Sequence, residues 1–154
     1  MELYLVQHAE AKAKDEDPAR PLSERGWESL EKVSGFLEGV GVNVVRILHS
    51  GKLRARQTAD KLGEVVGSSE GVGETDGLAP LDDPRIWGER LTEESDNVML
   101  VGHLPHLSRL SGLLISGDPD RKVIEFKNGG VVCLERDDEG NWSVVWIIIP
   151  QILD

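Results

Sequence analysis

Short apolar runs alternate with segments of helical periodicity along this chain. Three runs with the length and aliphatic content of buried strands lie in the first two thirds of the sequence: residues 2–7, 44–49 and 98–102. Apolar residues at helical spacing predict four helices. The first follows the N-cap Ser23 and is stopped by Gly39 and Gly41, and the others cover residues 53–66, 86–94 and 106–114. Beyond Gly117 the pattern predicts three more strands: residues 123–126, 131–135 and 142–149.

This order of elements predicts the fold class. Strands that alternate with helices and are then followed by strands indicate an α/β chain. We expect one three-layer α/β/α domain over residues 1–154, with a mixed sheet that is mostly parallel. The sequence contains no internal repeat.

Charge limits the range of partners. The chain has 17 basic and 28 acidic residues, a formal net charge of −11, which argues against sequence-independent binding of nucleic acid. The acidic excess is concentrated in residues 68–97, which we interpret as a solvated face. Because residues 1–67 are nearly neutral, the N-terminal half has enough cations to form a local anion pocket.

Two further features bear on the class of protein. Cys133 is the only cysteine, so an intrachain disulfide and a multi-cysteine metal cage are excluded. The first residues carry no secretory pattern, and the apolar run Val144–Ile149 is far shorter than the roughly 20 residues of a membrane helix. We therefore expect a cytoplasmic protein without a membrane partner.

The three predicted strands of the first two thirds end in residues suited to catalysis. The first ends at Gln7 and His8, the second leads into Ser50 and Arg54, and the third ends at His103. Ligands of open α/β sheets bind at the carboxyl ends of the strands. Two histidines and an arginine that meet there would provide a nucleophile and a cation, as phosphoryl transfer requires.

These residues resemble the histidine phosphatase superfamily, in particular its short phosphohistidine phosphatase (SixA-type) branch. Four segments carry the resemblance, in the expected order and spacing: Leu5–Ala9, Arg20–Ser23 with Gly26, Ser50 with Arg54–Thr58, and Val101–Pro105. They span about residues 1–110, and the total length also fits this branch.

The resemblance implies a role for each matching residue. His8 matches the histidine that takes the phosphoryl group, and His103 matches the second histidine that contacts phosphoryl oxygens. Arg54 matches a phosphate-binding arginine, Arg20 matches a further arginine of the same pocket, and Gln7 lies at another substrate-binding position. The implied chemistry rests on positioning and electrostatics, so we expect no metal and no cofactor.

One position departs from the family pattern. Gln7 stands where the family has an arginine, and Ala9 stands where it has a glycine. Gln7 can donate one N–H but brings no charge, which we expect to weaken transition-state binding by about 10- to 100-fold. Lys52 and Arg56 are two candidates for the missing charge, although Arg56 should face away from Arg54.

The sequence leaves three functions open. The first is a phosphatase that removes a phosphoryl group from phosphohistidine in a protein through a phospho-His8 intermediate. The second is a weakened phosphate- or phosphoprotein-binding module, and the third is a phosphatase acting on small phosphate esters. Esters require a general acid. Asp82 or Asp83 could serve as that acid, or both could simply form a turn before Pro84.

The remaining histidines and the tryptophans are more simply interpreted as structural. His103 and His106 have metal-ligand spacing, but two ligands without a third make a poor site. His49 is expected to be structural. Trp27 is expected on the core face of its helix, and Trp142 and Trp146 on one shared face of their strand.

Overall fold

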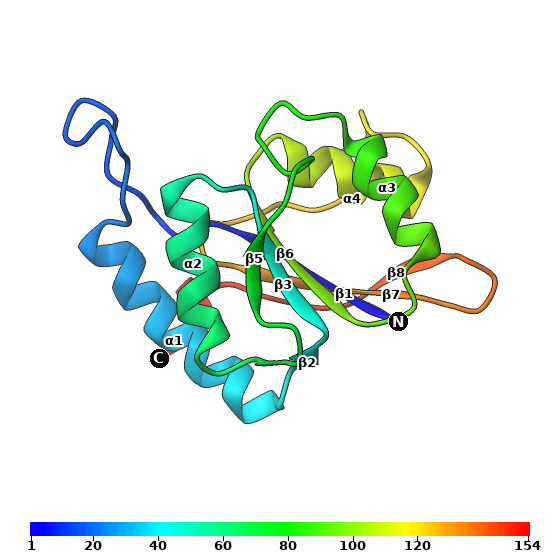
Figure 1. Ribbon diagram of the computed structural model, residues 1–154, viewed down its shortest axis with the longest axis horizontal. Helices are drawn as coiled ribbons and strands as arrows, with labels where there is room; N and C mark the ends of the chain where they lie inside the picture. The colour runs from blue at the N-terminus through cyan, green and yellow to red at the C-terminus, as the bar shows by residue number, and fades with distance from the viewer.

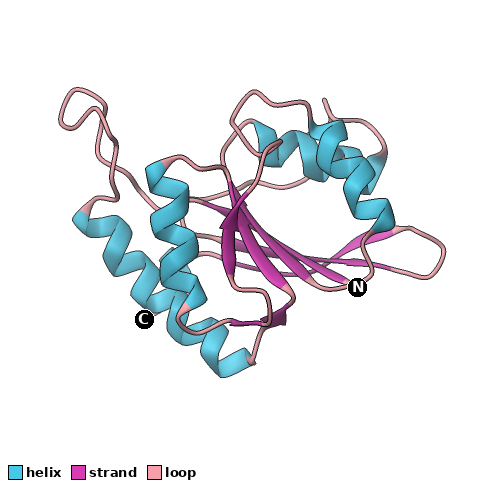
Figure 2. Cartoon of the chain, in the orientation of Figure 1, coloured by secondary structure: helices cyan, strands magenta, loops and turns pink.

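The computed structural model describes residues 1–154. It consists of a central sheet that lies between two pairs of helices (Figures 1 and 2). The strand order is β5-β3-β6-β1-β7-β8. The first four strands are parallel and the last two antiparallel. Their bounds are β1 Glu2–Gln7, β3 Arg46–His49, β5 Val72–Glu74, β6 Val98–Gly102, β7 Val131–Arg136 and β8 Trp142–Ile148. Two residues each form β2 (Asn43–Val44) and β4 (Gly67–Ser68), which pair separately.

The helices divide between the two faces of the sheet (Figure 2). One pair packs over one hydrophobic core and the other pair over a second. The pairs are α1 (Glu24–Val40) with α2 (Leu53–Gly63), and α3 (Pro84–Glu93) with α4 (His106–Ser116). A 3₁₀ turn, Pro150–Ile152, follows β8. The predicted α/β/α class with a mixed sheet is confirmed.

β1 lies at the centre of the sheet and is buried on both sides. Tyr4 and Val6 contribute to the core under α1 and α2, whereas Leu3 and Leu5 contribute to the core under α3 and α4. This alternation follows from the two-residue period of a strand. The carboxyl end of β1 is therefore held rigidly between two packed layers.

Several boundaries differ from the pattern-based prediction. The strand expected at 44–49 is interrupted at Val45 and divides into β2 and β3, and the second helix ends earlier, at Gly63. The strand expected at 123–126 is wrong. Ile124 and Phe126 are buried in the core under α3 and α4, so their spacing reflects side-chain burial and not sheet pairing. The short edge strand β5 was not predicted because it carries a single apolar residue, Val72.

The tryptophan predictions fail for local reasons. Trp27 is 38% exposed, because the buried stripe of α1 runs through Gly26 and Leu30 instead. Trp142 and Trp146 do not share a face. A bulge in the pairing of β7 with β8 shifts the register between them, so Trp146 packs on the α1 side and Trp142 on the α3 side.

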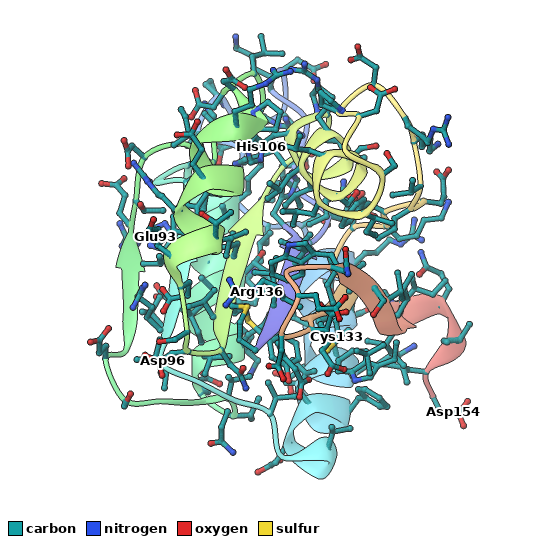
Figure 3. All side chains as sticks on the ribbon, turned by 90° about the vertical axis from the view of Figure 1, so that its right-hand side faces the viewer. Glu93, Asp96, His106, Cys133, Arg136 and Asp154 are labelled. Atoms are coloured by element: carbon teal, nitrogen blue, oxygen red, sulfur yellow. The ribbon has the colours of Figure 1, made fainter.

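The far end of β7 is tied to the third helix. Arg136, labelled in Figure 3, donates from Nη2 to the carbonyl oxygen of Glu94 at 2.6 Å and from Nη1 to that of Leu91. Cys133 on the same strand is buried and donates to a Glu2 carboxylate oxygen at 3.1 Å. Burial raises the pKa of the Cys133 thiol, which keeps it protonated.

No helix has both the length and the apolar character needed to cross a membrane.

Gly26 makes a close backbone contact that can be tested. A Cβ at this position would lie 2.2 Å from the carbonyl oxygen of Glu10, whereas a Cβ at Gly35 in the same helix would meet nothing within 4 Å. We expect Gly26→Ala to lower the free energy of unfolding by about 1–3 kcal/mol. The matched control Gly35→Ala should raise it by about 0.5–1 kcal/mol, because alanine favours the helix. Urea denaturation measures both, and equal effects of the two substitutions would contradict the contact.

Candidate active site

The parallel pairing of β1 with β6 brings the first two candidate residues together. Gln7 lies opposite Gly102 in the register, and the His8 N–H donates to the Gly102 carbonyl oxygen at 3.0 Å. The residues that follow the two strands, His8 and His103, are therefore neighbours. Their ring centroids lie 5.0 Å apart, and both side chains are buried.

The tautomer of His8 follows from its hydrogen bond. Nδ1 lies 2.7 Å from the carbonyl oxygen of Ala9, and because a carbonyl oxygen only accepts, Nδ1 carries the hydrogen. The lone pair is then on Nε2. Burial, opposed by the Ala9 bond and assisted by the charges of Arg54 and Arg20, lowers the pKa of His8 to about 4. The imidazole is neutral at pH 7 and available as a nucleophile.

His103 is held by Ser50. The serine Oγ lies 2.6 Å from His103 Nε2, whereas His103 Nδ1 is buried without a partner. Burial, together with nearby positive charge that includes Arg54, lowers the pKa of His103 to about 3. The sequence signal for Ser50 was its place in the motif directly after β3, but its bond to His103 was not predicted.

Two arginines extend the site from other segments. Arg54 lies in the first turn of α2, and its Nε is buried without a hydrogen-bond partner. The segment between β1 and α1 projects from the body of the molecule (Figure 1, upper left). Within this segment Arg20 Nε donates to the Lys12 carbonyl oxygen at 3.0 Å. Arg20 is the only non-glycine residue with a positive φ, 49°, a conformation that costs energy and is often kept at functional sites.

Gln57 and Thr58 join these segments. Thr58 Oγ1 accepts from the Ala9 N–H at 3.0 Å and donates to the Arg54 carbonyl oxygen at 2.8 Å. Gln57 Oε1 accepts from the Leu22 N–H at 2.8 Å. Thr58 thus holds the segment after His8 against α2, and Gln57 holds the segment after Arg20 against the same helix.

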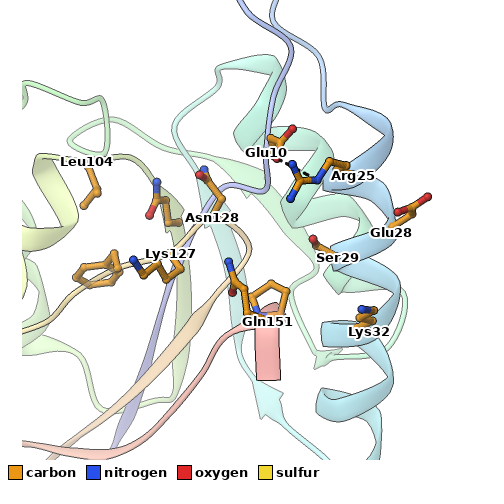
Figure 4. A pocket seen from close by; sticks show the side chains of 12 residues that line it. Glu10, Arg25, Glu28, Ser29, Lys32, Leu104, Lys127, Asn128 and Gln151 are labelled. Atoms are coloured by element: carbon orange, nitrogen blue, oxygen red, sulfur yellow. Dashed lines mark ion pairs between the residues drawn. The ribbon is translucent and has the colours of Figure 1, made fainter. Parts of the chain in front are cut away.

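Gln7 occupies the third side of the site. The loop before β7 fixes its backbone, since the Gly129 N–H donates to the Gln7 carbonyl oxygen at 2.9 Å and Asn128 Nδ2 donates to that of His8 at 3.0 Å. The Gln7 side chain is 9% exposed, and its Oε1 has no partner. It also lines a polar cleft of about 520 Å³ between α1, the segment 126–128 and the C-terminal turn (Figure 4). The two imidazoles do not line this cleft, and Gln7 adjoins them as the chain neighbour of His8.

The unsatisfied polar atoms of the protein gather here. Six buried side-chain nitrogen or oxygen atoms have no hydrogen-bond partner, and three of them belong to Gln7, Arg54 and His103. Buried polar atoms normally find partners. Positive charge predominates around the two imidazoles, where Arg20, Arg54 and Lys52 lower the pKa values and no carboxylate is among the causes. The Gln7 oxygen is an acceptor, but the unpaired Arg54 and His103 nitrogens and the positive charge suit an anion with several acceptor oxygens, such as a phosphoryl group.

The aspartate candidates lie in a turn. Asp82 Oδ2 accepts from the Ala79 N–H at 3.0 Å, and Asp83 caps α3 by accepting from the Arg85 N–H at 3.0 Å. Their charges bear on the pKa of His106, not on that of His8.

The other two histidines lie outside this arrangement. His106, labelled in Figure 3, is fully buried at the start of α4, and neither ring nitrogen has a partner. His49 Nδ1 accepts from the Gly51 N–H at 3.0 Å, which shapes the turn before α2. No group of three or more His, Cys, Asp or Glu side chains is placed to hold a metal ion.

Two proteins of similar sequence cover most of this chain. Phosphohistidine phosphatase SixA of Escherichia coli K12 is 26% identical over 156 residues, covering 97% of this chain and 94% of the relative. An uncharacterized protein of Picosynechococcus sp. is 33% identical over 142 residues, covering 87% of this chain and 84% of the relative.

Solved structures share the fold. The protein histidine phosphatase SixA in complex with tungstate superposes with a TM-score of 0.85 at 24% identity, covering 98% of both chains. The alpha-ribazole phosphatase of Shigella flexneri superposes with a TM-score of 0.74 at 16% identity, covering 94% of both chains. The family model of the histidine phosphatase superfamily (branch 1) matches residues 3–82, more than half of the sequence, and the chain therefore belongs to that superfamily.

Proposed function

We propose that this protein is a phosphatase that removes the phosphoryl group from phosphohistidine through a covalent intermediate on His8. Arg54 and Arg20 hold the phosphoryl oxygens, His103 donates to one of them, and Gln7 contacts the group from the side of the cleft. The relative SixA of E. coli is named a phosphohistidine phosphatase, which supports this substrate class.

The placement of the two aspartate candidates carries this choice. An ester leaves as an alkoxide and needs a general acid in the site. The charges that bear on His8 and His103 come from arginine, lysine and other histidines, while Asp82 and Asp83 are engaged in a turn and a helix cap. An imidazole that is protonated on its second nitrogen leaves as a neutral ring and needs no such acid.

The first step transfers the phosphoryl group. His8 Nε2 forms a bond to phosphorus as the phosphorus–nitrogen bond of the substrate breaks, and the substrate imidazole departs with the bonding electron pair. The hydrogen stays on His8 Nδ1, which continues to donate to the Ala9 carbonyl oxygen. The new phosphoimidazole is therefore cationic, and its phosphorus–nitrogen bond is activated for the second step.

The second step is hydrolysis. Water attacks phosphorus opposite His8, the bond to Nε2 breaks, and inorganic phosphate is released together with one proton to solvent. The cations around the phosphoryl group stabilise the charge on its oxygens during both steps, which is electrostatic and positional catalysis.

The first prediction concerns the nucleophile. The wild type should release phosphate from a protein phosphorylated on histidine, in buffer containing a metal chelator, and His8→Ala should lower the rate by at least about 1000-fold because the covalent intermediate cannot form. Phosphate release and radiolabelled phospho-His8 trapping measure the two effects.

A small ester provides the discriminating control. Phosphoserine should be hydrolysed at least about 100-fold more slowly than phosphohistidine, since its leaving group needs an acid. Faster hydrolysis of phosphoserine, lost in Asp82→Asn or Asp83→Asn, would contradict the assignment and favour an ester phosphatase.

The second prediction concerns protonation. Because the folded-state pKa values of His8 and His103 are lowered to about 4 and 3, both rings should stay neutral as pH falls from 8 to about 5, and they should gain a proton only below that range. Imidazole resonances in two-dimensional NMR, assigned with His8→Ala and His103→Ala, report this directly. A midpoint of about 6.5 for His8, the ordinary value, would contradict the buried neutral state.

The second candidate function, a binding module with little turnover, is favoured by a single observation. Gln7 brings no positive charge to the phosphoryl group. If that deficit limits the rate, Gln7→Arg should raise kcat/KM roughly 10- to 100-fold, the effect of one charged hydrogen bond. Steady-state kinetics on phosphohistidine decide the question. If the wild type binds phosphate without turnover and the Gln7→Arg variant hydrolyses the substrate, the natural protein is a binding module.

A further inference from the structure

The uncharged side chain at position 7 leaves the phosphoryl pocket with two arginines, and three further cations lie on neighbouring segments. The Arg56 side chain on α2 is 63% exposed, and its Nε lies 3.9 Å from Asp60 Oδ2. Its charge bears on the pKa of His49 and not on those of the paired imidazoles. Lys127 lines the same cleft as Gln7, and its Nζ lies 4.0 Å from Glu125 Oε1. Its charge is not among the causes that shift the pKa of either paired imidazole.

Lys52 differs from these residues in its connection to the site. It is the N-cap of α2, and its N–H donates to Ser50 Oγ at 3.3 Å. The same oxygen lies 2.6 Å from His103 Nε2, so the Lys52 backbone is two hydrogen bonds away from that imidazole. Its positive charge is one of the causes that lower the pKa of His103.

The side chain of Lys52 is available to a ligand. It is exposed and forms no ion pair with a carboxylate, in contrast to Arg56 and Lys61 on the same helix. An ammonium group on a flexible stem can reorient toward an anion that binds beside His103. Arg54, two residues further on, already contributes its charge to the same pair of histidines.

We propose that Lys52 is a further phosphate-binding residue, whose ammonium group contacts the phosphoryl oxygens and supplies the positive charge that Gln7 does not. This inference rests on the proposed function, since it assumes that the site receives a phosphoryl group. It also predicts that positions 7 and 52 act on the same charge and are therefore energetically coupled.

A double-mutant cycle tests the coupling. The variants are Lys52→Met, Gln7→Arg and the pair, with Arg56→Met as the matched control on the same helix and Lys52→Arg as the charge-retaining variant. Two readouts are used: kcat/KM for a phosphohistidine protein, and the Kd of tungstate by calorimetry. The second readout requires no turnover.

Lys52→Met should lower kcat/KM and weaken tungstate binding by roughly 3- to 30-fold, as expected for an exposed ammonium contact with an anion. Arg56→Met should stay within about twofold of wild type, and Lys52→Arg should retain most of the binding. In the Gln7→Arg background the loss should shrink to less than about threefold, because arginine then supplies the charge. The loss should also diminish at high salt, which screens an exposed cation.

Two results would overturn the proposal. One is a Lys52→Met variant no different from Arg56→Met, and the other is an equal loss in both backgrounds, which would make Lys52 independent of position 7. Failure of the proposed function gives a different pattern: no phosphohistidine turnover in any variant, while tungstate binding still follows position 52.

Discussion

The pairing of β1 with β6 is the constraint on which the site depends. Parallel strands present their carboxyl ends at one edge of a sheet, and the register that sets Gln7 opposite Gly102 makes the next residues, His8 and His103, neighbours. A shift by one residue would turn one imidazole to the other face of the sheet. The aliphatic residues of both strands are buried in cores on both faces, and this burial fixes the register. The packing of the two strands thus holds the geometry of the candidate site.

The protein itself leaves polar groups of the site without hydrogen-bond partners. Two desolvated imidazoles remain neutral beside two guanidinium groups, and an Arg54 donor and a His103 nitrogen are buried without partners. Each unpaired buried polar group costs about 1–3 kcal/mol. A phosphoryl group would supply the missing acceptors, so part of its binding energy comes from relieving this cost. The backbone of Arg20 is held at a positive φ of 49°, next to a segment that Gln57 fixes by accepting from the Leu22 N–H.

Much of this arrangement could be predicted from the sequence because it is encoded in local patterns. The bounds of β1 and β6, the Ser23 cap and the convergence of strand ends all follow from short-range signals. What could not be predicted depends on contacts between distant segments. The bond from Ser50 to His103 and the loop bonds of Asn128 require the tertiary structure. The run 123–126 shows the opposite error, since burial of alternate side chains imitates a strand when no partner edge is available.

The distribution of charge explains how a glutamine can be tolerated at position 7. Burial, together with the nearby charge of Arg20, lowers the pKa of Arg54, as expected for two cations that repel one another. A third guanidinium on β1, buried between two packed layers, would add to that repulsion. An exposed lysine at the start of α2 remains hydrated while the site is empty and approaches only when an anion arrives. A lysine at position 52 in place of an arginine at position 7 therefore avoids this repulsion in the free protein. Its contact with the transition state is less rigid and more sensitive to salt.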